Sequence, residues 1–277
     1  MKNIIDGKKI SNIFLEEYKE KINKMIKKPT LVVIQVGDNP ASNIYVNNKK
    51  KITEKAGINF VLQKYEKITE KKLIEEIKKL NKNKKVTSIL VQLPLPEEFN
   101  QKNVIEAIEP SKDVDGLTSL NIGRLFAGEK GIVPCTALGV MNLLKYKKIN
   151  LEGKNVVIVG RSKLVGLPLI ALMQKENATV TICHSKTKKL KEKTKEADVL
   201  IIAVGKPNLI KKDMIKENVI IIDVGINRIN EKICGDADFN QIKEKAKLIT
   251  PVPGGVGPMT VATLVNNVIE CYNLQKK

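Results

Sequence analysis

Residues 155–168 have the sequence NVVIVGRSKLVGLP, in which a short apolar strand runs directly into a loop with two glycines. A helix is predicted from 169 to about 175, and residues 179–183 (TVTIC) predict a second strand. Strand, glycine loop, helix and strand in this order are typical of the first unit of a dinucleotide-binding domain. The usual Gly-x-Gly-x-x-Gly spacing is not literal, because Ser162 and Val165 occupy its second and third glycine positions and Gly166 follows. The prediction of a dinucleotide-binding domain therefore rests on the strands and the helix around the loop. We expect a pyrophosphate at the N-terminus of that helix.

The end of the second strand indicates which dinucleotide is bound. Enzymes that use NAD commonly place an acidic residue there to hold the ribose 2′-hydroxyl, but residues 183–187 read CHSKT. Arg161, one of only three arginines, lies in the glycine loop. Arg161 with Ser185 and nearby lysines suits a 2′-phosphate, so the sequence predicts NADP. His184, the only histidine, is expected to make a structural hydrogen bond at the strand end rather than to act in catalysis.

Two further strands, 199–203 and 219–223, are predicted in this half of the chain, and each ends in a glycine-containing loop. Residues 250–260 (TPVPGGVGPMT) form a stiff segment rich in proline and glycine before a last predicted helix. Such a segment is too apolar for a linker and lets the backbone approach a flat molecule closely. We therefore interpret it as a ligand-facing loop.

The first half of the chain also alternates helices and strands. Strands are predicted at 31–36, 59–62 and 87–92, and helices at 10–26 and 73–80. This alternation predicts a parallel sheet with helices on its faces, in which ligands bind at the carboxyl ends of the strands.

Tyr45 and Lys49 lie four residues apart in a predicted helix that ends near residue 57, with Ser42 as its expected N-cap. That spacing puts a phenol and an amine on one face of the helix, where they could act as an acid/base pair. The alternative is a solvated helix face with one more lysine. Gln92 ends a neighbouring strand, so Tyr45, Lys49 and Gln92 are expected to meet at one edge of the sheet.

The segment 110–117 (PSKDVDGL) is rich in turn residues and contains two carboxylates. Asp113 and Asp115 could be solvated turn residues or helix caps, and the residues alone leave this open. After it, a helix is predicted from 135 to about 146, with Thr136 as its cap and a hinge between domains nearby.

The composition excludes several classes of protein. The net charge of +19 raises the possibility of a nucleic-acid-binding protein, but lysines are spread along the chain, tryptophan is absent and aromatics are few. No apolar run is long enough to cross a membrane, and the N-terminus has no signal-peptide pattern. The four cysteines form no Cys-x-x-Cys pair, which argues against a zinc site or disulfides and favours the cytoplasm.

Taken together, these segments resemble the bifunctional methylenetetrahydrofolate dehydrogenase/methenyltetrahydrofolate cyclohydrolase family over essentially the full length. The motifs that carry the resemblance are YVNNK (45–49), VQLPLP (91–96), KDVDGL (112–117), PCT (134–136), GRSKLVGLP (160–168), CHSKT (183–187), DVGINR (223–228) and TPVPGGVGPMT (250–260). Departures are few and touch no catalytic role: Ala137, Ala237 and the pair Glu98-Phe99 replace residues more usual in the family.

The resemblance implies two α/β domains with a cleft between them. A folate-binding catalytic domain of residues 1–140 plus 258–277 would carry a parallel sheet, and residues 141–257 would form a Rossmann-type NADP-binding domain. The implied function is oxidation of 5,10-methylenetetrahydrofolate to the methenyl compound with NADP, followed by hydrolysis to 10-formyltetrahydrofolate. The family also implies a homodimer through the dinucleotide domain, with no metal.

The resemblance also implies roles for particular residues. Lys49 would be the central acid/base, with Gln92 hydrogen-bonded near its amine, Tyr45 along the folate rings and Asp115 accepting from the pterin N–H groups. The other implied contacts to substrate are Val91, Leu93, Pro253, Gly254, Gly255, Val256 and Gly257, and those to NADP are Gly160, Arg161, Ser162, Ser185 and Ile226.

Another NADP-dependent dehydrogenase class uses a Tyr-x-x-x-Lys pair, namely the short-chain dehydrogenases. In that class the glycine loop opens the chain and the Tyr-Lys pair follows much later. Here Tyr45 and Lys49 precede the glycine loop at Gly160. The reversed order argues against this alternative.

Overall fold

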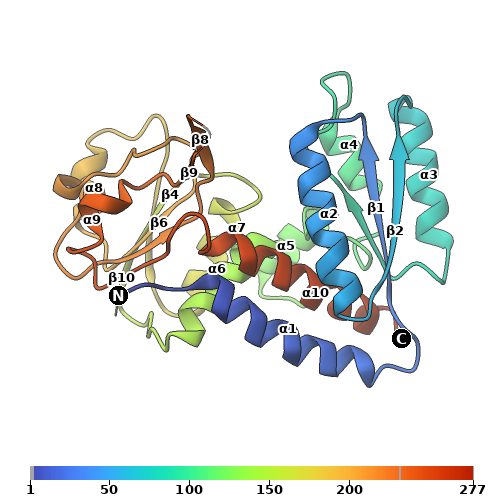
Figure 1. Cartoon of the computed structure of the whole chain (residues 1–277), viewed down its shortest axis with the longest axis horizontal. Coiled ribbons are helices and arrows are strands. Elements are labelled where there is room, and N and C mark those ends of the chain that lie inside the picture. Colours follow the sequence, from blue (N-terminus) through green and yellow to red (C-terminus); the bar gives the residue numbers. More distant parts are fainter. Residues whose placement is uncertain (1–2, 231, 277) are drawn as a thin grey trace. The chain divides into compact units, whose positions relative to one another are not determined.

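The computed structural model describes residues 3–230 and 232–276. Its contacts divide the chain into two compact units, which we name by their sheets (Figure 1). The three-stranded unit comprises Ile13–Cys135 and Val261–Lys277, and the five-stranded unit comprises the chain up to Asn12 and Thr136–Thr260. Two helices, α1 (Gly7–Asn23) and α10 (Val256–Leu274), contribute residues to both units.

The three-stranded unit is built on a parallel sheet with the strand order β2-β1-β3. The remaining elements of this unit are β1 (Thr30–Val36), α2 (Pro40–Lys55), β2 (Asn59–Tyr65), α3 (Glu70–Lys82), β3 (Ser88–Val91), α4 (Gln101–Glu106) and α5 (Ser119–Ala127). In β1, Leu31 and Val33 pack into a core with α1 and α10, whereas Val32, Ile34 and Val36 pack into a second core with α3 and α4. The central strand β1 is thus covered on both faces, as its apolar sequence predicts, whereas the edge strand β2 is largely exposed.

The five-stranded unit has the parallel strand order β10-β7-β6-β4-β5 and a separate two-stranded antiparallel ribbon, β8–β9. Its elements are α6 (Cys135–Tyr146), β4 (Asn155–Val159), α7 (Gly166–Lys175), β5 (Thr179–Cys183), α8 (Leu190–Lys195), β6 (Val199–Ile202), a 3-10 helix (Lys212–Met214), β7 (Ile220–Asp223), β8 (Asn227–Ile229), β9 (Lys232–Cys234), α9 (Phe239–Ile242) and β10 (Leu248–Ile249). The first β–loop–α–β unit predicted from the sequence is confirmed as β4, α7 and β5.

Two predicted helix caps are wrong. Ser42 lies inside α2, and its backbone N–H donates to Asn39 Oδ1 at 3.2 Å, so Asn39 caps this helix and Pro40 is its first residue. Thr136 also lies inside its helix, because α6 begins at Cys135. In addition, α10 begins at Val256, within the segment expected to be a loop, because the two glycines before it complete the turn into the helix.

The first residues of the chain pack with the five-stranded unit. Ile5 N–H donates to Ile249 O at 2.8 Å, and Ile249 N–H donates to Asn3 O at 2.9 Å. This pairing with β10 explains why the structural division differs from the sequence-based one, which assigned residues 1–140 to one domain. The functional domains themselves, 1–140 plus 258–277 and 141–257, stay a prediction.

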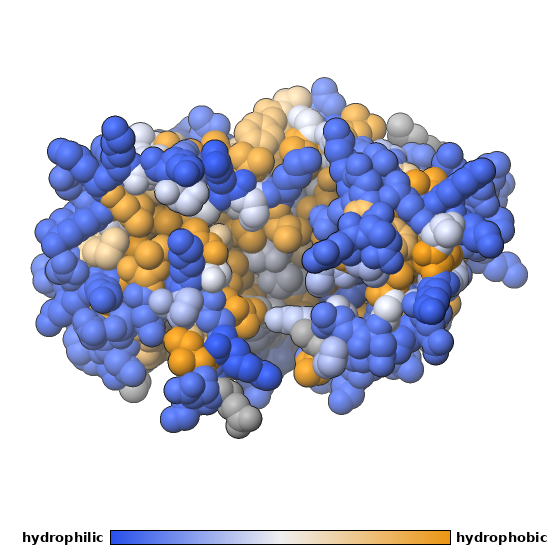
Figure 2. Space-filling model, turned by 90° about the horizontal axis from the view of Figure 1, so that it is seen from above, coloured by the Kyte–Doolittle hydropathy of each residue, from blue (hydrophilic) through white to orange (hydrophobic). Residues whose placement is uncertain are grey.

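Hydrophilic residues cover most of the face shown in Figure 2, with apolar patches between them. Among the described residues, no helix combines the length and apolar character that a membrane crossing requires.

Candidate functional site

The predicted pair of Lys49 and Gln92 is brought together at the carboxyl end of the three-stranded sheet. Lys49 Nζ, on α2, donates a hydrogen bond to Gln92 Oε1 at 3.0 Å. Gln92 follows β3, and its backbone N–H donates to Ile34 O at 2.8 Å, which continues the pairing of β3 with β1. Its amide Nε2 donates to Leu93 O at 2.6 Å, so the oxygen is turned toward the amine. Since an ammonium can only donate, this orientation of the amide satisfies both side chains.

Tyr45 lies one helical turn before Lys49 on α2. Its ring is 46% exposed, and this leaves an apolar surface open to a ligand beside a half-buried amine. The two neighbours of Gln92 differ from each other: Val91 is 2% exposed and packs in the core, whereas Leu93 is only partly buried.

Polar contacts hold the first turn of α2 to the end of β1. Gln35, which is buried at the carboxyl end of β1, donates to Asn43 Oδ1 at 2.6 Å. Asn43 donates to Asp38 Oδ1 at 2.9 Å, and Lys64 Nζ donates to the same oxygen at 2.6 Å. The Lys64 ammonium, followed by the Asn43 amide, lowers the pKa of Asp38 below its usual value. These bonds fix the helix that carries Tyr45 and Lys49.

The two carboxylates of the 110–117 segment have different surroundings. Asp113 is 1% exposed and accepts hydrogen bonds from Thr118 N–H at 2.8 Å and from the Asn121 amide at 3.0 Å. Burial raises its pKa above the usual value, and it is therefore not a solvated turn residue. Asp115 is only half-buried. The following Gly116 has φ +66°, and a Cβ there would lie 2.6 Å from Ile132 O, so only glycine fits this turn.

Cys135 is a buried thiol whose pKa is affected by both Asp115 and Lys49. Burial raises the pKa of Cys135 well above its usual value, the Asp115 carboxylate raises it further, and the Lys49 amine opposes this. Both charged groups therefore lie within electrostatic reach of one sulfur atom. The amide of Asn267 holds the sulfur in place, donating to Sγ at 3.3 Å and to Val114 O at 2.9 Å. No role was predicted for Cys135, which sequence reasoning named only as part of the motif at 134–136.

In the five-stranded unit, the glycine loop packs closely against its neighbours at two glycines. Gly160 has φ +130°, and a Cβ there would lie 2.3 Å from Ala203 O. A Cβ on Gly166, the first residue of α7, would lie 2.1 Å from Gly160 O. In the usual pattern, the third glycine lets the helix approach the loop closely, and Val165 occupies that position here. Gly166, the next residue, provides this close approach instead.

The residues predicted to select the 2′-phosphate follow two paired strands. Gly160 N–H donates to Cys183 O at 2.9 Å, so β4 and β5 stay in register up to their carboxyl ends. Arg161 and Ser185 come next on the two strands and are both exposed, as is Ser162. His184 Nδ1 accepts from Lys186 N–H at 3.2 Å, which is the structural hydrogen bond expected for it.

The other predicted contacts also lie in the five-stranded unit. Ile226 follows β7 and is 52% exposed. Of the predicted contacts 253–257, the last two residues begin α10. Before the helix, Gly254 has φ +103°, and a Cβ on Gly255 would lie 2.5 Å from Pro251 O, so the backbone is tightly folded there. The role of this loop toward the substrate stays a prediction.

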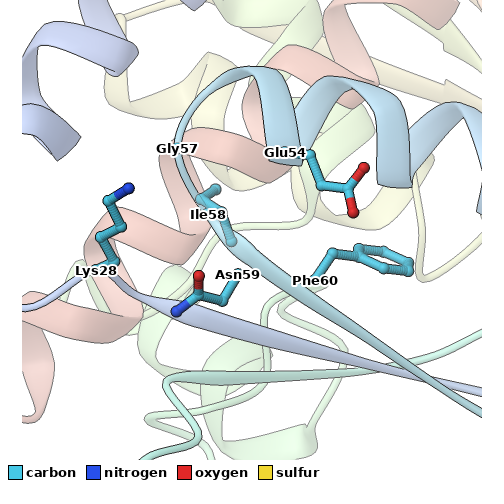
Figure 3. Close-up of a pocket in the computed structure, with 6 residues that line it drawn as sticks. All are labelled: Lys28, Glu54, Gly57, Ile58, Asn59 and Phe60. Carbon is cyan, nitrogen blue, oxygen red and sulfur yellow. The ribbon is translucent and has the colours of Figure 1, made fainter.

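One hollow lies at the opposite end of the three-stranded sheet (Figure 3). It is lined by Lys28, Glu54, Gly57, Ile58, Asn59 and Phe60. These residues surround the start of β2, whereas Gln92 follows the carboxyl end of β3. The hollow contains none of the predicted site residues.

Comparison with known proteins covers nearly the whole chain. The profile described as "Tetrahydrofolate dehydrogenase/cyclohydrolase, catalytic domain" matches residues 5–115, and that of the "NAD(P)-binding domain" of the same name matches residues 134–276. The chain is 49% identical to "Bifunctional protein FolD" of Agathobacter rectalis over 275 residues, which covers 98% of this chain and 99% of the relative.

Solved structures agree in fold. The chain is similar to the bifunctional enzyme FolD-methylenetetrahydrofolate dehydrogenase/cyclohydrolase of Campylobacter jejuni, with a TM-score of 0.95, 46% identity and 98% of each chain covered. It is also similar to the Trypanosoma brucei methylenetetrahydrofolate dehydrogenase-cyclohydrolase, whose structure holds an NADP cofactor and an inhibitor. In that comparison the TM-score is 0.92, the identity is 33%, and 98% of this chain and 97% of the other are covered.

Proposed function

The chain belongs to the tetrahydrofolate dehydrogenase/cyclohydrolase family, and from this membership we propose which of its residues carry the two activities. The protein is a bifunctional enzyme of one-carbon metabolism. It oxidises 5,10-methylenetetrahydrofolate to 5,10-methenyltetrahydrofolate with NADP, and it hydrolyses the product to 10-formyltetrahydrofolate. The observation that carries the assignment of residues is the hydrogen bond between Lys49 and Gln92.

Lys49 is the acid/base of the hydrolysis. Water attacks the methenyl carbon, a carbon–oxygen bond forms, and one carbon–nitrogen bond of the ring then breaks. Lys49 takes one proton from the attacking water and passes it to the departing nitrogen, and the hydroxyl of the adduct loses its remaining proton to solvent as the formyl C=O bond forms. Gln92 Oε1, 3.0 Å from Nζ, holds the amine in place throughout. The bond between Gln92 Nε2 and Leu93 O keeps that oxygen from turning away.

Tyr45 and Asp115 position the folate. The exposed ring of Tyr45 offers an apolar face beside the amine, on which the flat ring system of the substrate packs. The carboxylate of Asp115 accepts hydrogen bonds from the adjacent N–H donors of the pterin. Burial of Asp113 and the turn at Gly116 hold Asp115 at the edge of the sheet.

The glycine loop binds NADP. Close approach of Gly160 to Ala203 and of Gly166 to Gly160 leaves the N-terminus of α7 open to the pyrophosphate, so these residues fit the cofactor. Arg161 and Ser185 hold the 2′-phosphate, while Ser162 and Ile226 complete the contacts. When bound, NADP accepts a hydride from the methylene carbon, and the enzyme's part in this step is to orient the two reactants.

A spectrophotometric assay with 5,10-methylenetetrahydrofolate tests the function. We expect absorbance of the reduced nucleotide to form faster with NADP than with NAD at equal concentrations. With methenyltetrahydrofolate alone, the methenyl absorbance should disappear faster with enzyme than without it. An enzyme that hydrolyses the methenyl compound at the uncatalysed rate would contradict the assignment of the second activity.

The protein forms a homodimer through its five-stranded unit. The ribbon β8–β9 exposes Ile229 and Ile233, each 41% exposed, and its apolar surface would be covered by a second copy. Sedimentation velocity tests this proposal: the wild type should sediment as a dimer, and a variant with both Ile229→Lys and Ile233→Lys as a monomer. A monomeric wild type, or a variant that stays dimeric, would contradict it.

The enzyme acts in the cytoplasm. All four cysteines are free thiols, and three of them are buried, which suits a reducing compartment. Cell fractionation should recover the enzyme with cytoplasmic markers, and recovery with an exported fraction would contradict this location.

A further inference from the structure

Asp236 is a buried carboxylate that joins two loops of the five-stranded unit. Its side chain is completely buried. One carboxylate oxygen accepts hydrogen bonds from Val204 N–H at 2.7 Å and Gly205 N–H at 3.0 Å. The other accepts from Lys206 N–H and from the Asn227 amide, both at 2.8 Å. These four donors use the full acceptor capacity of a carboxylate.

Both loops lie where a dinucleotide binds. Residues 204–206 follow β6, and the segment after β7 leads to Asn227, the first residue of β8; β6 and β7 are adjacent strands near the middle of the parallel sheet. Ligands of such sheets gather at the edge formed by the carboxyl ends of the strands. Asn227 directly follows Ile226, and the residue before Val204 is Ala203, which packs against Gly160. Asp236 therefore ties together the backbone on two sides of the proposed NADP site.

A second carboxylate supports the first. Asp223 accepts from the backbone N–H groups of Gly225 at 2.9 Å, Asp236 at 3.1 Å and Ala237 at 2.8 Å. A Cβ on Gly225 would lie 2.2 Å from the Asp236 carboxylate, so glycine is needed for this approach. The two buried acids and this glycine form one hydrogen-bonded layer under the edge of the sheet.

We propose that Asp236 is a positioning residue for NADP, which holds the segment 204–206 and Asn227 in the arrangement that receives the dinucleotide. Because Asp236 is completely buried and already accepts four hydrogen bonds, it acts through the backbone and not by direct contact with the dinucleotide. The inference rests on the proposed position of NADP at this edge of the sheet. In Asp236→Asn, an amide NH₂ replaces one acceptor oxygen and faces backbone N–H groups, so at least one hydrogen bond is lost while the shape is kept.

The test compares Asp236→Asn with a matched variant of the same unit. Asp198 also accepts from a backbone N–H, that of Asn155 at 2.9 Å, and from Lys216 Nζ at 2.6 Å. It lies before β6, at the opposite end of the same sheet. Asp198→Asn therefore removes the same charge and perturbs two hydrogen bonds, against four at Asp236, far from the proposed NADP site.

We expect Asp236→Asn to raise the Kd for NADPH, measured by fluorescence titration, and the KM for NADP by about tenfold. Asp198→Asn should lower the melting temperature but leave both constants at their wild-type values. The rate of methenyltetrahydrofolate hydrolysis, measured without NADP, should be no lower in Asp236→Asn than in Asp198→Asn. Asn227→Ala, which removes one donor to Asp236, should weaken NADPH binding in the same direction by a smaller factor.

Unchanged Kd and KM in Asp236→Asn, with a melting temperature lowered as in Asp198→Asn, would overturn the inference, since Asp236 would then be structural only. If Asp236→Asn does not fold, the Kd of Asn227→Ala for NADPH becomes the test. An unchanged Kd in that variant overturns the inference as well. A wild-type protein that does not bind NADPH would instead refute the proposed cofactor site, so the two failures are distinguishable.

Discussion

Replacing Lys49 by methionine removes the proposed acid/base with little change in shape. Methionine is unbranched like lysine and keeps most of the packing of the stem. The substitution removes the hydrogen bond from Nζ to Gln92 Oε1 at 3.0 Å. Gln92 is 8% exposed, so its oxygen retains some access to water. The loss should cost about 1–3 kcal/mol of folding free energy, which a stable domain tolerates.

The effect on hydrolysis should be much larger than on oxidation. General acid–base catalysis contributes about 10²–10⁴-fold, or roughly 3–5 kcal/mol of the barrier. Hydride transfer needs no proton from the amine, so oxidation of methylenetetrahydrofolate should fall by only about tenfold, through weaker positioning of the substrate. The two rates are measured separately, as loss of methenyl absorbance without NADP and as formation of NADPH.

Lys50→Met is the control. Lys50 is the next residue of α2, its side chain is 51% exposed, and its ion pair with Glu54 is long, at 4.0 Å. This variant loses the same charge from the same helix and should keep both rates. A Lys49→Met protein that is folded by circular dichroism and hydrolyses the methenyl compound as fast as Lys50→Met would refute the assignment. Equal losses of hydrolysis and oxidation would show that the amine acts in positioning alone.

Three further predictions concern the five-stranded unit. Arg161→Ala should raise the KM for NADP about tenfold or more and leave the KM for NAD nearly unchanged, because only NADP carries the 2′-phosphate; equal effects in kinetic assays would contradict this. Gly166→Ala should weaken NADPH binding in titrations and lower the melting temperature, because its Cβ would lie 2.1 Å from Gly160 O. If this variant binds NADPH as tightly as the wild type, the close approach of Gly166 to Gly160 is not needed for binding. Burial raises the pKa of Asp223 from 3.8 to about 6. Between these two pH values Asp223 is protonated in the folded protein and ionised in the unfolded chain. Its contribution to the free energy of unfolding therefore falls as pH rises from about 4 to about 6. The free energy of unfolding is measured with denaturant at pH 4.5 and at pH 7. Relative to wild type, Asp223→Asn should be more stable at pH 7 than at pH 4.5 by about 2 kcal/mol, and a pH-independent difference would contradict this.

The central strands were predictable because both of their faces are covered. A strand buried on both sides needs a nearly continuous apolar run, and 31–36, 155–159 and 199–202 are such runs. The helix starts were less predictable, because several polar residues near a start compete as the cap. At α2 the sequence does contain the deciding signal: Pro40 is favoured at the first helical position, so the preceding Asn39, rather than Ser42, is the cap.

Within the candidate site, the contact between Lys49 and Gln92 was predictable, since one residue lies on a helix face and the other at a strand end. The surroundings of Cys135 were not. Its sulfur is held by Asn267, which lies 132 residues further along the chain. The role of Asp236 was not predicted for the same reason. Its hydrogen-bond partners lie 9 to 32 residues away in the sequence, in segments whose course no local pattern specifies.

Two buried acids, Asp113 and Asp236, show how the fold fixes its functional loops. Asp113 accepts from one backbone N–H, that of Thr118, and from the Asn121 amide. Asp236 accepts from three backbone N–H groups and from the Asn227 amide. A carboxylate suits this task because it has only acceptors and can bind several donors from different segments at once. The cost of burying the charge is offset only when those donors are held in place, so loop and carboxylate stabilise each other. An asparagine in either position would present donors to donors, and we therefore expect loss of loop order before loss of the fold.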